Sequence, residues 1–119
     1  MIEGACHCGN IRWCLAAEPE TLTDCNCSFC RRTQALWAYA GRQDVTITVG
    51  PAGRVHYSRG DRTLAFVSCA GCGGTTHWQG LGPTNERVAV NMRMATDAAA
   101  ITRFRIRHFD GAESWTYAD

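Results

Sequence analysis

Seven of the eight cysteines in this chain fall into three short clusters. Their spacings are C-x-C, C-x-C-x-x-C and C-x-x-C, within Cys6–Cys8, Cys25–Cys30 and Cys69–Cys72. Thiolates at such spacings can converge on a metal, and zinc takes about four ligands in a tetrahedron. Seven ligands divide into four and three, so we predict two zinc ions per chain. A site with only three protein ligands keeps a position for water or substrate.

A disulfide framework is the alternative reading, since an even number of cysteines could pair completely. The C-x-C spacing argues against it, because thiols so close in sequence are poorly placed to bridge each other. The first residues, Met1–Cys6, show no basic region followed by an apolar one, so we expect no secretory signal. We therefore expect a cytoplasmic protein, in which thiols stay reduced and available to metal.

The first and third clusters share a local design. Each lies between two strand-like segments and is followed by glycine, Gly9 in one case and Gly73 in the other. Glycine lets the backbone turn so that its amides can face sulfur. This pattern predicts two zinc knuckles at hairpin tips that meet. The predicted ligands of this closed, structural zinc site are Cys6, Cys8, Cys69 and Cys72.

The middle cluster lies in what the sequence predicts to be a polar loop, and it runs into Arg31 and Arg32. Cys25, Cys27 and Cys30 would hold the second zinc and leave one position open. Such a zinc prefers a further sulfur ligand, and a thiol bound there would be the nucleophilic thiolate. The two arginines could bind an anionic substrate. A further protein ligand could instead close the site, and the candidates are His7, Cys14, His56 and His77.

The remaining pattern predicts a mainly β fold. Alternating apolar and polar residues indicate short strands. They are expected near residues 11–15, 45–49, 55–57, 63–68, 88–92 and 104–108. Short helical turns are expected after Cys27 and over residues 96–101, where Thr96 or Asp97 would be the cap. No linker or repeat interrupts the chain, so we expect a single domain over residues 1–119, with small antiparallel β-sheets packed around the zinc knuckles.

Charge and hydropathy exclude two classes of partner. The formal net charge is +1, and seven zinc-bound thiolates with two Zn²⁺ ions would bring it to about −2. A general affinity for nucleic acid is therefore not expected. No apolar run approaches the roughly 18 residues of a membrane span, so no membrane partner is expected. The expected partner is a small-molecule thiol.

Several segments together carry a resemblance to a known family. They are Gly4–Ile11, Cys25–Arg32, Cys69–Gly73, Asn91–Arg93 and Phe109–Gly111. With these segments the chain resembles, over essentially its whole length, the glutathione-dependent formaldehyde-activating family, which also contains centromere protein V. The resemblance implies a zinc-bound fold of small antiparallel β-sheets. It also implies a structural zinc at the first and third clusters and the glutathione-site zinc at the middle cluster.

The founding activity of that family is the condensation of formaldehyde with glutathione to S-hydroxymethylglutathione, classed as a carbon–sulfur lyase reaction. The resemblance therefore implies a zinc-dependent lyase that acts on a glutathione or small-thiol adduct. Cys25, Cys27 and Cys30 would be the ligands of the catalytic zinc, and Arg31 and Arg32 would bind substrate. The alternative is a non-catalytic zinc-binding module that binds a thiol or a protein partner.

Overall fold

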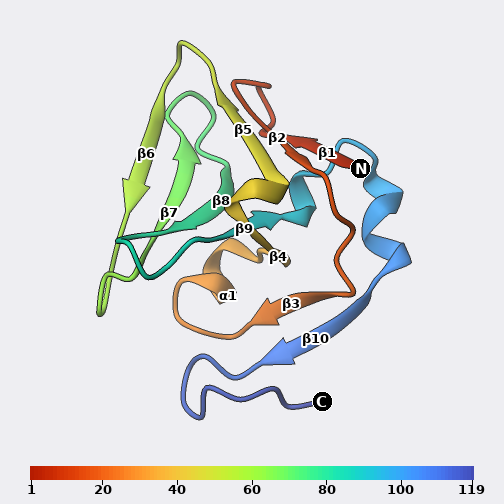
Figure 1. Cartoon of the computed structure of the whole chain (residues 1–119), viewed down its shortest axis with the longest axis vertical. Helices are drawn as coiled ribbons and strands as arrows, with labels where there is room; N and C mark the ends of the chain where they lie inside the picture. The colour runs from red at the N-terminus through yellow and green to blue at the C-terminus, as the bar shows by residue number, and fades with distance from the viewer.

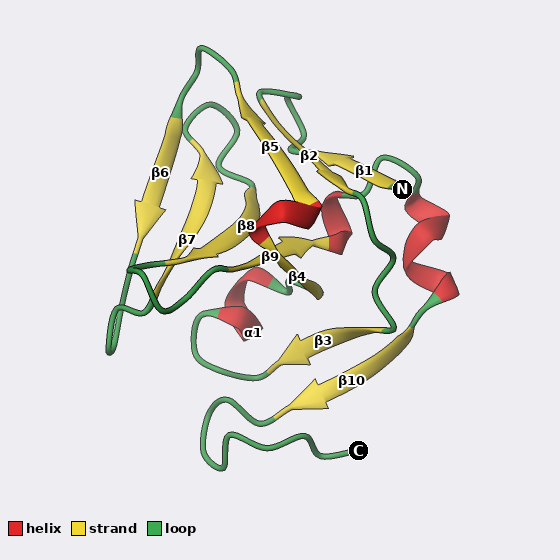
Figure 2. Ribbon diagram, in the orientation of Figure 1, coloured by secondary structure: helices red, strands yellow, loops and turns green.

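The computed structural model describes residues 1–119, which form two β-sheets (Figures 1 and 2). The smaller sheet has three strands in the order β1-β2-β5, all antiparallel. Their bounds are Ile2–Ala5, Ile11–Leu15 and Val45–Val49. Every second residue of β2 is buried, namely Ile11, Trp13 and Leu15. This strict alternation explains why the sequence alone predicts the strand.

The larger sheet has seven strands in the order β10-β3-β4-β9-β8-β7-β6. In chain order, they are β3 (Thr21–Cys25), β4 (Trp37–Gly41), β6 (Arg54–Tyr57), β7 (Leu64–Cys69), β8 (Thr75–Gly80), β9 (Arg87–Asn91) and β10 (Arg105–Phe109). All neighbours are antiparallel except β10 and β3, which are parallel. Figure 1 shows β3 and β10 running side by side in the same direction.

The helical segments are short. Helix α1 spans Cys30–Thr33, as expected after Cys27, and three 3₁₀ turns span Arg42–Asp44, Met92–Met94 and Ala98–Arg103. The last turn matches the predicted one, and its cap is Asp97, which accepts a hydrogen bond from the Ala99 N–H at 3.0 Å. None of the helices has the length and apolar character that a membrane-crossing helix requires.

One local prediction is wrong. The stretch that precedes Cys25 is the strand β3 and not a polar loop. It lies between β4 and β10, so both of its edges have partners, and Leu22 and Thr23 are buried. Tertiary pairing therefore overrides a sequence pattern that is too polar to indicate a strand. The prediction of a mainly β fold is confirmed, with two sheets that are antiparallel except for the pair β10 and β3.

Two main groups of buried residues hold the sheets and position the cysteines. One group fills the space between the small sheet and the large sheet and includes Trp13, Leu22 and Val90. The other is an aromatic group that packs directly around the middle cysteine cluster. Its buried members are Cys25, Cys30, Ala35, Trp37, Phe66, Trp78 and Ala89. The middle cluster therefore sits on one face of the large sheet and not in an isolated loop.

Candidate metal centres

The first and third cysteine clusters lie in two turns of the same form. One turn joins β1 to β2 and the other joins β7 to β8. Gly9 and Gly73 both have φ of 80°, and each donates its N–H to the carbonyl three or four residues back, Cys6 and Cys69, at 2.9 Å. A left-handed φ favours glycine. This common geometry agrees with the predicted pair of zinc knuckles.

The sulfur atoms of Cys6, Cys8, Cys69 and Cys72 all lie within 4.8 Å of one another. The Sγ–Sγ distance is 3.8 Å between Cys6 and Cys8 and 3.6 Å between Cys8 and Cys69. Four sulfurs at about 2.3 Å from a zinc ion in a tetrahedron are about 3.8 Å apart. A disulfide requires about 2.05 Å, and all eight cysteines are free. The donor set therefore fits zinc, and the disulfide alternative does not describe this structure.

Backbone and amide N–H groups surround these sulfurs. Cys69 Sγ accepts hydrogen bonds from the N–H groups of Gly71 and Cys72, at 3.2 and 3.4 Å. It also accepts one from Asn10 Nδ2 at 3.4 Å, and the same amide nitrogen donates to the Gly53 carbonyl at 2.9 Å. The Cys72 N–H is the main cause that lowers the pKa of Cys69 to about 6. Such donors stabilise thiolates and orient them toward a metal.

The middle cluster forms a second group of sulfurs. Cys25 ends β3, Cys27 follows in the loop, and Cys30 begins α1. Their three sulfur atoms lie within 4.8 Å of one another. Cys27 Sγ accepts from the Cys30 N–H at 3.3 Å, and Cys30 Sγ accepts from Trp37 Nε1 at 3.3 Å. The indole donor comes from β4, so a neighbouring strand also fixes the cluster.

The pKa values of two thiols in the middle cluster, Cys25 and Cys30, shift in opposite directions. A hydrogen bond from the Cys30 thiol is the main cause that lowers the pKa of Cys25 to about 6. The same contact, together with burial, raises the pKa of Cys30. Of these two thiols, Cys25 is therefore the one whose pKa favours the thiolate form that binds metal.

None of the four candidate closing ligands joins the middle cluster. The group of Cys, His, Asp and Glu ligand atoms that lie within 4.8 Å of one another has three members there, Cys25, Cys27 and Cys30. His77 is fully buried in β8 and hydrogen-bonds Thr76 Oγ1 through Nδ1 at 2.8 Å. The others lie elsewhere: His7 beside Cys6, Cys14 in β2 and His56 in β6. The middle cluster therefore offers three ligands, whereas the first and third clusters together offer four.

The model of the family described as glutathione-dependent formaldehyde-activating enzyme matches residues 1–108. The chain belongs to this family. All seven clustered cysteines lie within the matched residues. The crystal structure of a Rhodobacter sphaeroides protein, a structural genomics target, is similar to this structure, with a TM-score of 0.71 and 29% sequence identity. That similarity covers 88% of this chain and 99% of the other. A comparison with curated proteins found no match.

The structure distinguishes the two arginines that follow the middle cluster in this family member. Both are exposed and lie in α1. Arg32 Nη1 donates to the Ser28 carbonyl at 2.7 Å, so this side chain folds back on its own loop. The guanidinium of Arg31 makes no hydrogen bond or ion pair with the protein. Of the two guanidinium groups, that of Arg31 is therefore the one without a partner in the protein.

Aromatic rings form a wall beside the three sulfurs. Phe29, in the loop between Cys27 and Cys30, stacks on Phe66 with ring centroids 3.8 Å apart. Its ring also stacks on Tyr57 at 5.7 Å, and Tyr57 is 52% exposed. The aromatic surface thus continues from the buried sulfur cluster to solvent. Sequence reasoning did not find this wall, because Tyr57, Phe66 and Phe29 are brought together only by strand pairing and loop packing.

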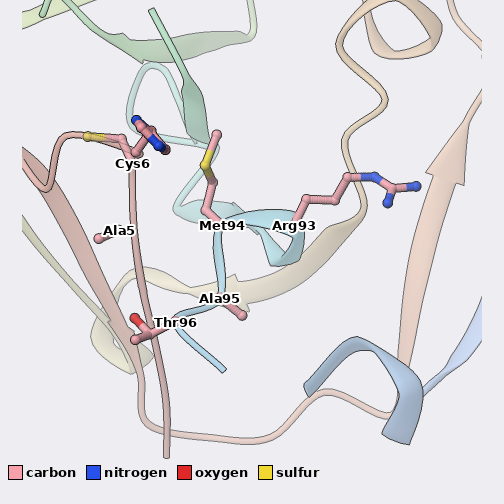
Figure 3. A pocket seen from close by; sticks show the side chains of 7 residues that line it. Ala5, Cys6, Arg93, Met94, Ala95 and Thr96 are labelled. Atoms are coloured by element: carbon pink, nitrogen blue, oxygen red, sulfur yellow. The ribbon is translucent and has the colours of Figure 1, made fainter. Parts of the chain in front are cut away.

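A cavity of about 340 Å³ lies beside the four-cysteine cluster (Figure 3). Its lining includes Cys6, Met94 and Thr96. In Figure 3 the Arg93 side chain points away from Cys6, and its Nε donates to the Gln34 carbonyl. The one arginine of this cavity therefore braces the end of α1, and the cavity contains no part of the three-cysteine cluster.

Proposed function

We propose that this protein is a zinc-dependent enzyme of the carbon–sulfur lyase class that acts on a glutathione or small-thiol adduct, as S-(hydroxymethyl)glutathione synthase does. One observation carries the proposal: the middle cluster offers three sulfur ligands and no fourth protein ligand. Three protein ligands are typical of catalytic zinc, and four of structural zinc. Membership of the formaldehyde-activating family supports the choice of a thiol and an aldehyde as reactants.

The proposal assigns two zinc ions per chain, one to the four cysteines of the first and third clusters and one to the middle cluster. Cys6, Cys8, Cys69 and Cys72 would hold the structural zinc. Cys25, Cys27 and Cys30 would hold the second zinc, which would supply a position where a substrate thiol is kept as thiolate and a Lewis acid for a carbonyl. A cytoplasmic location, where thiols stay reduced, belongs to the same proposal.

The reaction is a simple addition. A bond forms between the thiol sulfur and the carbonyl carbon, and the thiol proton ends on the carbonyl oxygen, so neither oxidant nor reductant is needed. The protein's own residues have three tasks. The N–H groups of Cys30 and Trp37 hold two sulfurs in place. The Phe29 wall shields one side from water, and Arg31 attracts a substrate carboxylate.

Cobalt in place of zinc gives the direct test, because cobalt–thiolate bands report a change of ligand. Glutathione at millimolar concentration should change the charge-transfer bands of the protein loaded with two cobalt ions. Zinc-loaded protein given glutathione and formaldehyde should then accelerate formation of S-hydroxymethylglutathione, measured by NMR. Unchanged bands would exclude glutathione as a ligand. A change of bands without acceleration would instead support the non-catalytic thiol-binding module.

Arg31→Ala should weaken glutathione binding by about fivefold to tenfold, because an exposed charged contact contributes about 1 kcal/mol. Arg32→Ala is the matched variant, and its effect should be smaller since its guanidinium is already engaged with Ser28. Titration of the cobalt bands with glutathione and with uncharged 2-mercaptoethanol measures both effects. Equal losses for the two thiols, or a larger loss in Arg32→Ala, would contradict a carboxylate contact at Arg31.

A further inference from the structure

The chain beyond β10 runs directly alongside the middle cysteine cluster. The parallel register of β10 and β3 sets Phe109 opposite Cys25. The Asn26 N–H donates to the Phe109 carbonyl at 3.2 Å, which continues the pairing past the end of both strands. Figure 1 shows the two strands ending together, with the C-terminal turn beyond them. Residues 110–112 are therefore neighbours of Cys25 and Cys27.

Asn26 clamps this turn with its side chain. Its Nδ2 donates to Asp110 Oδ1 at 3.0 Å, and its Oδ1 accepts from the Ala112 N–H at 3.0 Å. Asn26 lies between Cys25 and Cys27 in sequence, and its two contacts fall on either side of Gly111. The clamp therefore links the position of Gly111 directly to the loop that carries two of the three sulfurs.

Gly111 packs against the Cys25 sulfur. A Cβ at this position would lie 2.7 Å from Cys25 Sγ and 3.3 Å from Cys27 Cβ. Gly111 does not have a positive φ, so a left-handed backbone is not what requires glycine here. Glycine is required at position 111 because the two cysteines leave no space for a side chain. A side chain there would displace the sulfur.

The rest of the turn is held by hydrogen bonds within itself and by one contact with β3. The Trp115 N–H donates to the Asp110 carbonyl at 2.7 Å, and Ser114 Oγ donates to Asp110 Oδ2 at 2.9 Å. At the far end, the Tyr117 hydroxyl lies 3.0 Å from Thr23 Oγ1. Thr23 is a buried residue of β3. The far end of the turn is thus attached to β3, and its near end to Asn26, the residue that follows this strand.

We propose that the turn 110–117 is a positioning element of the three-cysteine site. Asn26 holds the turn so that Gly111 buttresses the Cys25 sulfur and closes that side of the cluster. This inference rests on the proposed function in that it takes the cluster to bind a metal. It adds to the proposed function a positioning role for the turn that follows β10.

A side-chain series at Gly111 tests the proposal. Gly111→Ala should weaken cobalt binding at the second site at least tenfold, and Gly111→Val should weaken it further, because the displacement of Cys25 Sγ grows with side-chain size. At saturating cobalt, the ligand-field bands of that site should shift in both variants. Ala112→Ser is the matched control: it adds one atom at an exposed neighbour and keeps the N–H that Asn26 accepts. Its affinity should stay within twofold of the wild type.

Asn26→Ala provides a second and independent measurement. Loss of both clamp contacts should weaken the second metal severalfold, while the metal of the four-cysteine site and the thermal melt stay as in the wild type. Competition with a chromophoric chelator measures both affinities. If the wild type binds two metals and both Gly111→Ala and Asn26→Ala retain second-site affinity within twofold, the positioning role is overturned. A wild-type protein that binds metal only at the four-cysteine site would instead overturn the proposed function.

Discussion

Cys72→Ser should destabilise the entire fold. The four-cysteine cluster joins turns that are distant in sequence; Cys8 and Cys69 alone are 61 residues apart. Structural zinc contributes about 10–16 kcal/mol in small peptides, whereas a whole domain is stable by about 5–15 kcal/mol. Cys72 is exposed, so serine fits its space and the variant removes little apart from a metal ligand. The loss should therefore reflect the metal and not packing.

Thermal melts followed by circular dichroism, with zinc content measured on the same samples, would test this expectation. A loss of about 3 kcal/mol lowers the melting temperature of a domain of this size by roughly 10 °C or more. Cys14→Ser is the matched control, because Cys14 is the one cysteine outside the clusters. If Cys72→Ser melts within a few degrees of Cys14→Ser, the four-cysteine cluster does not hold the fold together.

Short-range signals in the sequence predict much of this structure. The knuckle turns could be predicted because the cysteine spacing and the following glycine lie within a few residues of each other, as at Cys6 to Gly9 and Cys69 to Gly73. Strands with strict alternation, such as β2 and β5, could be predicted for the same reason. The grouping of the first cluster with the third depended on one further assumption, that two hairpin tips meet, and the sulfur distances agree with it.

Long-range pairing explains what the sequence could not predict. The polar strand β3 has no clear alternation, and it is a strand because β4 and β10 pair with its two edges. The contact between Asn26 and Asp110 spans 84 residues, so no local pattern indicates that Gly111 lies against Cys25. Likewise, the sequence alone does not distinguish the roles of the adjacent residues Arg31 and Arg32. Only the direction of the Arg32 side chain toward Ser28 separates them.

Cys27→Ser, in contrast to Cys72→Ser, should leave the fold largely intact. Cys25, Cys27 and Cys30 are close in sequence, so a metal there closes only a short loop and restricts the unfolded chain little. The surrounding aromatic group, with Trp37 and Phe66, provides apolar packing that the substitution leaves in place. We therefore expect the melting temperature to change by less than about 5 °C. The second zinc should be lost, together with the cobalt response to glutathione and nearly all lyase activity.

The comparison of the two serine variants decides what the middle cluster does. Cys27 Sγ accepts one backbone hydrogen bond, from Cys30 at 3.3 Å, and a serine oxygen can accept the same bond, so the loop keeps its local contact. What serine does not replace is a thiolate ligand to zinc. Zinc content near one per chain with an intact melt would separate a functional site from a structural one. If Cys27→Ser unfolds the protein as severely as Cys72→Ser, the middle cluster is structural and the proposed enzyme loses its main support.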